Sequence, residues 1–154
     1  MLAARCKLDR RQAIIDIGIQ PFPLEIAGVR PEAQAPQISI TRYRALIDTG
    51  AQRTCLTNST IAKEGLIRPG HKYIRNVHSE ATHSLFMALI GIYGTDGGDT
   101  WSDEPARSYF GIDVPVEVIN IADNENFDAI IGMDVLENFS FRFDKGGDFE
   151  LTLA

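Results

Sequence analysis

A short apolar run that ends on an acidic residue constrains this chain more than any other feature. Residues 45–51 read A-L-I-D-T-G-A, so three residues typical of a buried strand lead directly into Asp48. A carboxylate that loses water costs free energy unless a partner pairs with it or a reaction uses it. Asp and Gly are also common turn residues, so D-T-G alone fits a plain turn. Other features of the sequence are therefore needed to tell whether Asp48 is a turn residue or a reactive group.

Most other segments have the patterns of β-strands. Short apolar or alternating runs occupy residues 13–19, 37–47, 73–77, 85–93, 114–121 and 127–131. Phe139, Phe141 and Phe143 alternate with polar residues before the turn D-K-G-G-D, and F-E-L-T-L follows it, which predicts a hairpin with one apolar face. Short helices are expected only over residues 57–64, which a glycine follows, and over residues 133–138. The sequence therefore predicts an all-β fold.

Length and composition limit the classes of function. The 154 residues suggest one domain over 1–154, in which the charge-interrupted residues 1–12 are a candidate flexible N-terminal extension. The net charge of −6 argues against nucleic acid as a partner. The longest apolar run, residues 85–93, is too short for membrane insertion at ~20 residues per span. Two cysteines make no disulfide framework, which favours a cytoplasmic location.

A second segment gives D-T-G its context. Residues 129–136 read A-I-I-G-M-D-V-L, an aliphatic pair and a glycine that lead into an expected helix. Each segment is weak alone, but together and in this order they are specific. On these residues the chain resembles the retropepsin-like aspartic proteases, roughly over residues 36–93 and 112–153. The resemblance implies an acid-protease barrel with one short C-terminal helix and one lobe per chain.

The resemblance also implies a reaction. In this family two carboxylates share a proton: the charged one activates a water, and the neutral one protonates the carbonyl oxygen of a peptide bond. The chain contains a single D-T-G. The other candidate acids lack a suitable context: Asp96 and Asp99 lie in a glycine-rich loop, Asp134 follows the glycine at 132 in the first turn of the expected helix, and Asp144 and Asp148 flank a turn. The economical solution is a symmetric homodimer in which one Asp48 from each subunit meets at the two-fold axis. The substrate would be an extended peptide, and no cofactor is needed.

The roles of neighbouring residues follow from the same resemblance. Thr49 would brace the two loops across the dimer axis, Gly50 would bring its N–H near the carboxylates, and Ala51 would leave room for substrate. Support from behind the loop is expected from Ile130, Ile131 and Gly132. A flap over the substrate is expected from Val77, His78, Ser79, Glu80 and Ala81, although this tip contains no glycine. The segment 149–153 is a candidate intersubunit strand.

Other functions remain as alternatives. A non-catalytic peptide-binding or scaffolding domain could keep the fold without hydrolysis. A glycosidase also uses two acids, but holds them ~5–9.5 Å apart. His71, His78 and His83 lack the spacing of zinc ligands, and the acidic residues between 96 and 104 lack that of an EF-hand, so no metal is expected.

Overall fold

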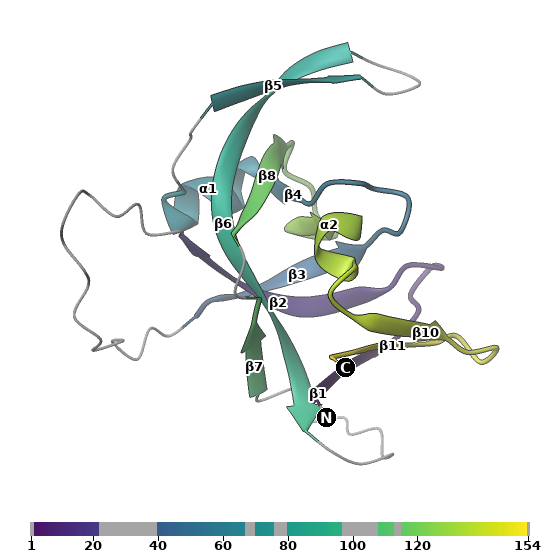
Figure 1. The fold of residues 1–154 in the computed structure, drawn as a ribbon. Coiled ribbons are helices and arrows are strands. Elements are labelled where there is room, and N and C mark those ends of the chain that lie inside the picture. The colour runs from purple at the N-terminus through teal and green to yellow at the C-terminus, as the bar shows by residue number, and fades with distance from the viewer. Residues whose placement is uncertain are drawn as a thin grey trace, which may run out of the picture.

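Eleven strands and two short helices make up the described part of the chain. The computed structural model describes residues 2–21, 40–66, 70–75, 80–96, 108–112 and 115–153. In chain order the elements are β1 Leu2–Lys7, β2 Ile14–Pro21, β3 Arg42–Ile47, β4 Cys55–Thr57, α1 Asn58–Glu64, β5 Gly70–Arg75, β6 Glu80–Asp96, β7 Ser108–Gly111, β8 Val116–Ile121, β9 Ala129–Ile131, α2 Met133–Leu136, β10 Ser140–Phe143 and β11 Asp148–Thr152. The all-β prediction is confirmed (Figure 1).

Six of these strands close into a barrel. The order β2-β3-β9-β4-β8 continues from β8 to β6, and β6 pairs with β2 again. β3 and β9 run parallel, so the strand before Asp48 lies beside the aliphatic pair at 130–131. The interior is filled by fully buried aliphatic side chains, among them Ile17, Leu56 and Ile90. The two sequence segments that carried the family resemblance are therefore neighbours in one barrel wall.

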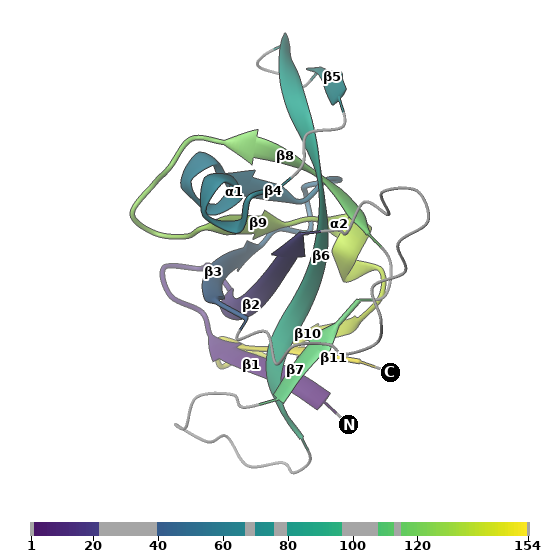
Figure 2. The same ribbon diagram turned by 90° about the vertical axis from the view of Figure 1, so that its left-hand side faces the viewer.

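The long strand β6 connects the barrel to its surroundings. Its 17 residues pair in succession with β5, β8, β2, β7 and β1. Beyond the barrel it forms a hairpin with β5, which stands away from the body of the molecule (Figure 2). Arg75 pairs with Glu80, so Glu80 and Ala81 of the expected flap belong to β6. The other expected flap residues, 77–79, lie outside the described residues.

A second, smaller layer consists of the strands at the two ends of the chain. β11 lies between β10 and β1, and β1 in turn pairs with β6. Residues 2–7 of the candidate N-terminal extension thus form a strand. The prediction that residues 149–153 supply an intersubunit strand is wrong, because β10 and β1 already occupy both edges of β11.

Helix α1 has the ends that its sequence predicts. The side chain of Thr57 accepts a hydrogen bond from the Thr60 N–H as N-cap, and Gly65 closes the helix in the left-handed conformation (φ 61°). Within the helix, Thr60 and Ile61 are buried. The predicted helix over 133–138 is confirmed as a single turn, α2.

Candidate active site

Asp48 stands directly after β3, at the point where the barrel wall turns into a loop. Its N–H donates to the carbonyl of Ile131 (3.0 Å), so its backbone is tied to β9. The N–H of Gly50 donates to Oδ1 of Asp48 (2.9 Å), and the N–H of Ala51 donates to the Asp48 carbonyl (3.2 Å). The carboxylate is half-buried and held in a fixed direction.

Gly132 lets α2 approach the loop closely. A Cβ on Gly132 would lie 2.7 Å from the carbonyl carbon and oxygen of Arg53 and 2.9 Å from the carbonyl oxygen of Ala51. Without that Cβ, the N–H of Met133 donates to the Ala51 carbonyl (2.8 Å). The N–H of Asp134 also donates to the Gln52 carbonyl (3.3 Å). The glycine is therefore needed for contact between the helix and the loop.

A buried threonine and an aspartate lock the same contact, and the sequence analysis did not identify them. Thr54 is fully buried and donates from Oγ1 to Oδ1 of Asp134 (2.7 Å). Its N–H donates to Oδ2 of Asp134 (3.0 Å), and its Oγ1 accepts from the Gly132 N–H (3.1 Å). The signal in the sequence was that Thr54 and Asp134 are polar residues in otherwise apolar surroundings.

The other residues expected to support the loop differ in burial. Ile131 is fully buried, Ile130 and Ala51 are half-buried, and Thr49 is exposed beside Asp48. All of them adjoin the loop, either through the β3–β9 pairing or through the chain itself. Of the flap residues, Val77, His78 and Ser79 lie outside the described residues.

Cys55 is a poor nucleophile in this setting. Burial above all, and then the nearby Asp134 and Asp48 carboxylates, raise the pKa of its thiol to about 11. The thiolate is the reactive form of cysteine, so it is scarce at neutral pH. The reactive group that the loop presents is therefore the carboxylate of Asp48.

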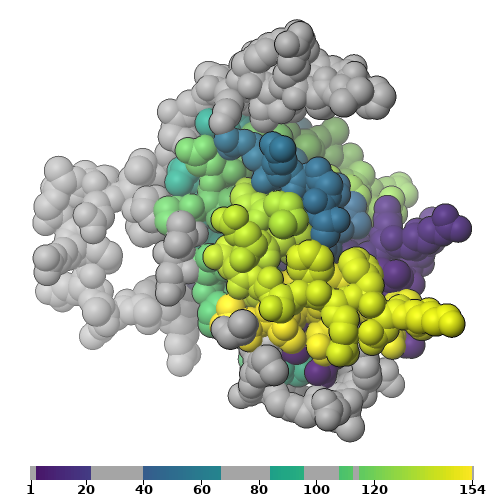
Figure 3. Space-filling view, turned by 45° about the vertical axis from the view of Figure 1, so that its right-hand side comes forward, coloured from purple at the N-terminus to yellow at the C-terminus, as the bar shows by residue number. Residues whose placement is uncertain are grey.

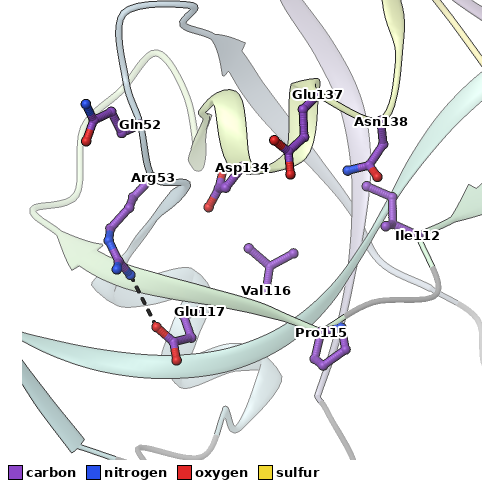
Figure 4. A pocket seen from close by; sticks show the side chains of 9 residues that line it. All are labelled: Gln52, Arg53, Ile112, Pro115, Val116, Glu117, Asp134, Glu137 and Asn138. Atoms are coloured by element: carbon purple, nitrogen blue, oxygen red, sulfur yellow. Dashed lines mark hydrogen bonds and ion pairs between the residues drawn. The ribbon is translucent and has the colours of Figure 1, made fainter.

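A pocket of about 490 Å³ opens beside the loop. Its walls come from the end of the loop, from the start of β8 and from α2 with the residues after it (Figure 4). Ile112 and Val116 are almost fully buried in its wall. On one side of the pocket, the carboxylate of Glu117 pairs with the guanidinium of Arg53 at 3.3 Å. The side chain of Arg53 thus points to β8.

The described part of the chain offers no cluster of three or more His, Cys, Asp or Glu side chains that could hold a metal ion. Among the same residues, no helix has the length and apolar character needed to span a bilayer.

Comparisons with known proteins bear on the fold. No protein-family model matches the chain, and a search of curated proteins finds no match. Among solved structures, it is similar to the crystal structure of a retropepsin-like aspartic protease from Rickettsia conorii. The two are 16% identical, with a TM-score of 0.55 over 97% of this chain and 89% of that one. At this identity the likeness concerns the fold: the chain has the retropepsin-like fold.

Proposed function

We propose that this protein is an aspartic endopeptidase that is active as a symmetric homodimer. The observation that carries the proposal is the Asp48 loop. A half-buried carboxylate receives the Gly50 N–H at 2.9 Å, and a glycine contact and a buried hydrogen-bonded brace fix the loop from behind. Contacts that fix the direction of one carboxylate in this way are expected where that carboxylate reacts, because positioning contributes strongly to catalysis.

The reaction needs two carboxylates, and a second copy supplies the other. A two-fold axis places a residue opposite itself, so the two Asp48 side chains meet in identical surroundings. Two acids held this close cannot both ionise easily, so the pair shares one proton at mildly acidic pH. The charged member takes a proton from a bound water, whose oxygen attacks the carbonyl carbon of the peptide. The neutral member gives its proton to the carbonyl oxygen.

The substrate in this proposal is a peptide in the extended conformation. It lies between the loop and the β5–β6 hairpin and pairs through its backbone, as strands added to a sheet edge do. The hairpin stands away from the barrel, as a segment that closes over a bound peptide has to (Figure 2). Activity is greatest at mildly acidic pH, since one acid of the pair has to stay protonated.

The test compares the wild type with Asp48→Asn and with Asp9→Asn as a matched control. Asp9 is exposed in the turn between β1 and β2, and asparagine suits such a turn equally well. Each protein is incubated with a peptide library between about pH 4 and 7, and products are identified by mass spectrometry.

Cleavage by the wild type and by Asp9→Asn, but not by folded Asp48→Asn, is the expected result. Cleavage that survives in Asp48→Asn would refute the aspartic mechanism. Absence of cleavage by all three, with peptides still bound, would favour the non-catalytic binding domain instead.

A further inference from the structure

The pocket beside the Asp48 loop is large enough to hold a ligand. Its volume of about 490 Å³ lies within the range of about 300–1,000 Å³ that is typical of small-molecule sites. In Figure 3 the blue, yellow-green and green segments of the chain, which supply its walls, meet on one face of the molecule. The hydrolysis proposed above uses the Asp48 loop and the hairpin, and it leaves this pocket without a role.

The polar side chains around the pocket carry an excess of negative charge. Glu117, Asp134 and Glu137 contribute three carboxylates, whereas Arg53 is the one cation among the described lining residues. The three carboxylates surround the same opening (Figure 4). A hollow lined by one sign of charge concentrates ions of the opposite sign. The pocket therefore favours a cation.

Asp134 can accept a hydrogen bond from such a cation. Its carboxylate already accepts from the N–H of Thr54 (3.0 Å), from the hydroxyl of Thr54 (2.7 Å) and from the N–H of Val135 (2.9 Å). A carboxylate offers about four acceptor positions, so one position is left by these three donors. A donor that approaches from the pocket can fill it without breaking the brace to Thr54.

The ion pair between Arg53 and Glu117 can give way to a bound cation. The guanidinium and the carboxylate are 3.3 Å apart, and the side chain of Glu117 is 53% exposed. An exposed ion pair of this kind contributes little to stability. Replacement of Arg53 by an incoming positive group therefore costs little, and Glu117 keeps a positive partner.

The apolar part of the wall specifies the shape of the cation. Ile112 and Val116 are almost fully buried, and Pro115 lines the same pocket. The methylenes of an arginine side chain can cover such a surface, while its planar guanidinium presents donors in several directions. Free arginine would add a carboxylate of its own, which the three acids of the pocket repel. An arginine within a peptide therefore fits the pocket best.

We propose that this pocket binds the arginine side chain of a peptide, at a site separate from the Asp48 carboxylate. The guanidinium lies between Glu117 and Glu137 and donates to Asp134, and its methylenes pack on the apolar wall. Binding at this site needs neither a reactive Asp48 nor a second copy of the chain. The inference therefore goes beyond the proposed function and does not depend on it.

The bound arginine would also act on the active-site loop. The N–H of Asp134 donates to the carbonyl of Gln52 (3.3 Å), and its carboxylate holds Thr54. Both residues lie in the segment that runs from Asp48 to β4. A guanidinium on Asp134 thus reaches, through one residue, the loop in which the Gly50 N–H donates to Asp48.

The first experiment titrates isotope-labelled wild type with N-acetyl-arginine amide and follows each backbone amide by NMR. The matched probe is N-acetyl-citrulline amide, which has the same shape without the charge. Neither probe joins two residues, so hydrolysis plays no part. The arginine probe should shift the amides of Val116, Glu117 and Glu137, with a dissociation constant at least about fivefold below that of citrulline. The Gly50 amide should shift with the same constant, and free arginine should bind more weakly.

The second experiment changes the charge of the pocket in both directions. Glu117→Gln removes an attractive charge and should raise the dissociation constant of the arginine probe by about threefold. Arg53→Gln removes the competing cation and should lower the constant by about the same factor. Glu125→Gln is the control, because Glu125 is exposed beyond the opposite end of β8. Urea unfolding verifies that all three variants fold.

Four results would overturn the proposal: shifts that spread over the acidic surface without saturating, equal binding of the two amide probes, free arginine that binds as tightly as its amide, or changes of the same sign in Glu117→Gln and Arg53→Gln. A Gly50 amide that stays unmoved at saturation would refute the connection to the loop. Cleavage is measured separately. Binding by a protein that cleaves nothing would keep this site and refute the enzyme, and Asp48-dependent cleavage without binding would do the reverse.

Discussion

Replacing Thr54 by valine should destabilise the protein far more than replacing it by serine. Valine keeps the shape of the side chain but removes the hydroxyl, which donates to Asp134 at 2.7 Å and accepts from the Gly132 N–H at 3.1 Å. A hydrogen bond to a charged group contributes about 1.5–3 kcal/mol, and a buried N–H left unpaired costs about 1–3 kcal/mol. We therefore expect a loss of about 3 kcal/mol in the free energy of unfolding.

Serine is the matched control for the hydroxyl. It keeps both hydrogen bonds and removes one methyl from a fully buried site, which costs about 1 kcal/mol. The two variants should thus differ by about 2 kcal/mol. With a denaturant slope of about 2 kcal/mol per molar urea, the valine midpoint falls about 1 M below that of serine.

The assay is urea unfolding followed by fluorescence, with all variants at one protein concentration because association shifts the midpoint. If the midpoints of the two variants agreed within about 0.2 M, the hydroxyl would not hold the loop. The reasoning that connects Thr54, Asp134 and Gly132 would then be wrong.

Two further predictions concern the same region. Gly132→Ala should lower the free energy of unfolding by about 1–3 kcal/mol and reduce any cleavage, because the new Cβ would lie 2.7 Å from backbone atoms of Arg53. In the control Gly111→Ala the new Cβ would meet only a ring carbon, at 3.7 Å, so this variant should lose little stability. Urea titration of both variants measures the difference. Alkylation of Cys55 at pH 8, followed by mass spectrometry, should be about a hundredfold slower than for a thiol with the reference pKa of 9.0, because its raised pKa of about 11 leaves little thiolate. The rate should climb until pH passes about 11, and a rate already maximal at pH 8 would contradict the raised pKa.

The local parts of the candidate site could be predicted from sequence, because their signals are local. An apolar run before D-T-G marks the end of a strand, and Thr57 and Gly65 mark both ends of α1. The brace between Thr54 and Asp134 could not be predicted in the same way. Eighty residues separate the two, and their segments come together because β9, which precedes Asp134, pairs with β4, which follows Thr54.

The end strands show a different limit. The charges of residues 2–7 suggested an extension, yet Ala3 and Ala4 are both buried in β1, while Lys7 is exposed. Because the buried residues are small, they give only a weak apolar signal in the sequence. The alternating phenylalanines correctly predicted that β10 is a strand with one apolar face. Phe141 and Phe143 nevertheless stay exposed, because β10 is the last strand of its sheet within the described residues.

The pairing of β1 with β11 has a consequence for synthesis. Ala3 lies opposite Thr152, so the first strand of the fold receives its main partner only when the last one has left the ribosome. At about 5–20 residues per second, β1 waits on the order of ten seconds. Pairing between distant segments is also slow to form. During that interval the edge of β1 that later pairs with β11 stays unpaired, so chaperones that bind such edges can act before β11 has been synthesised.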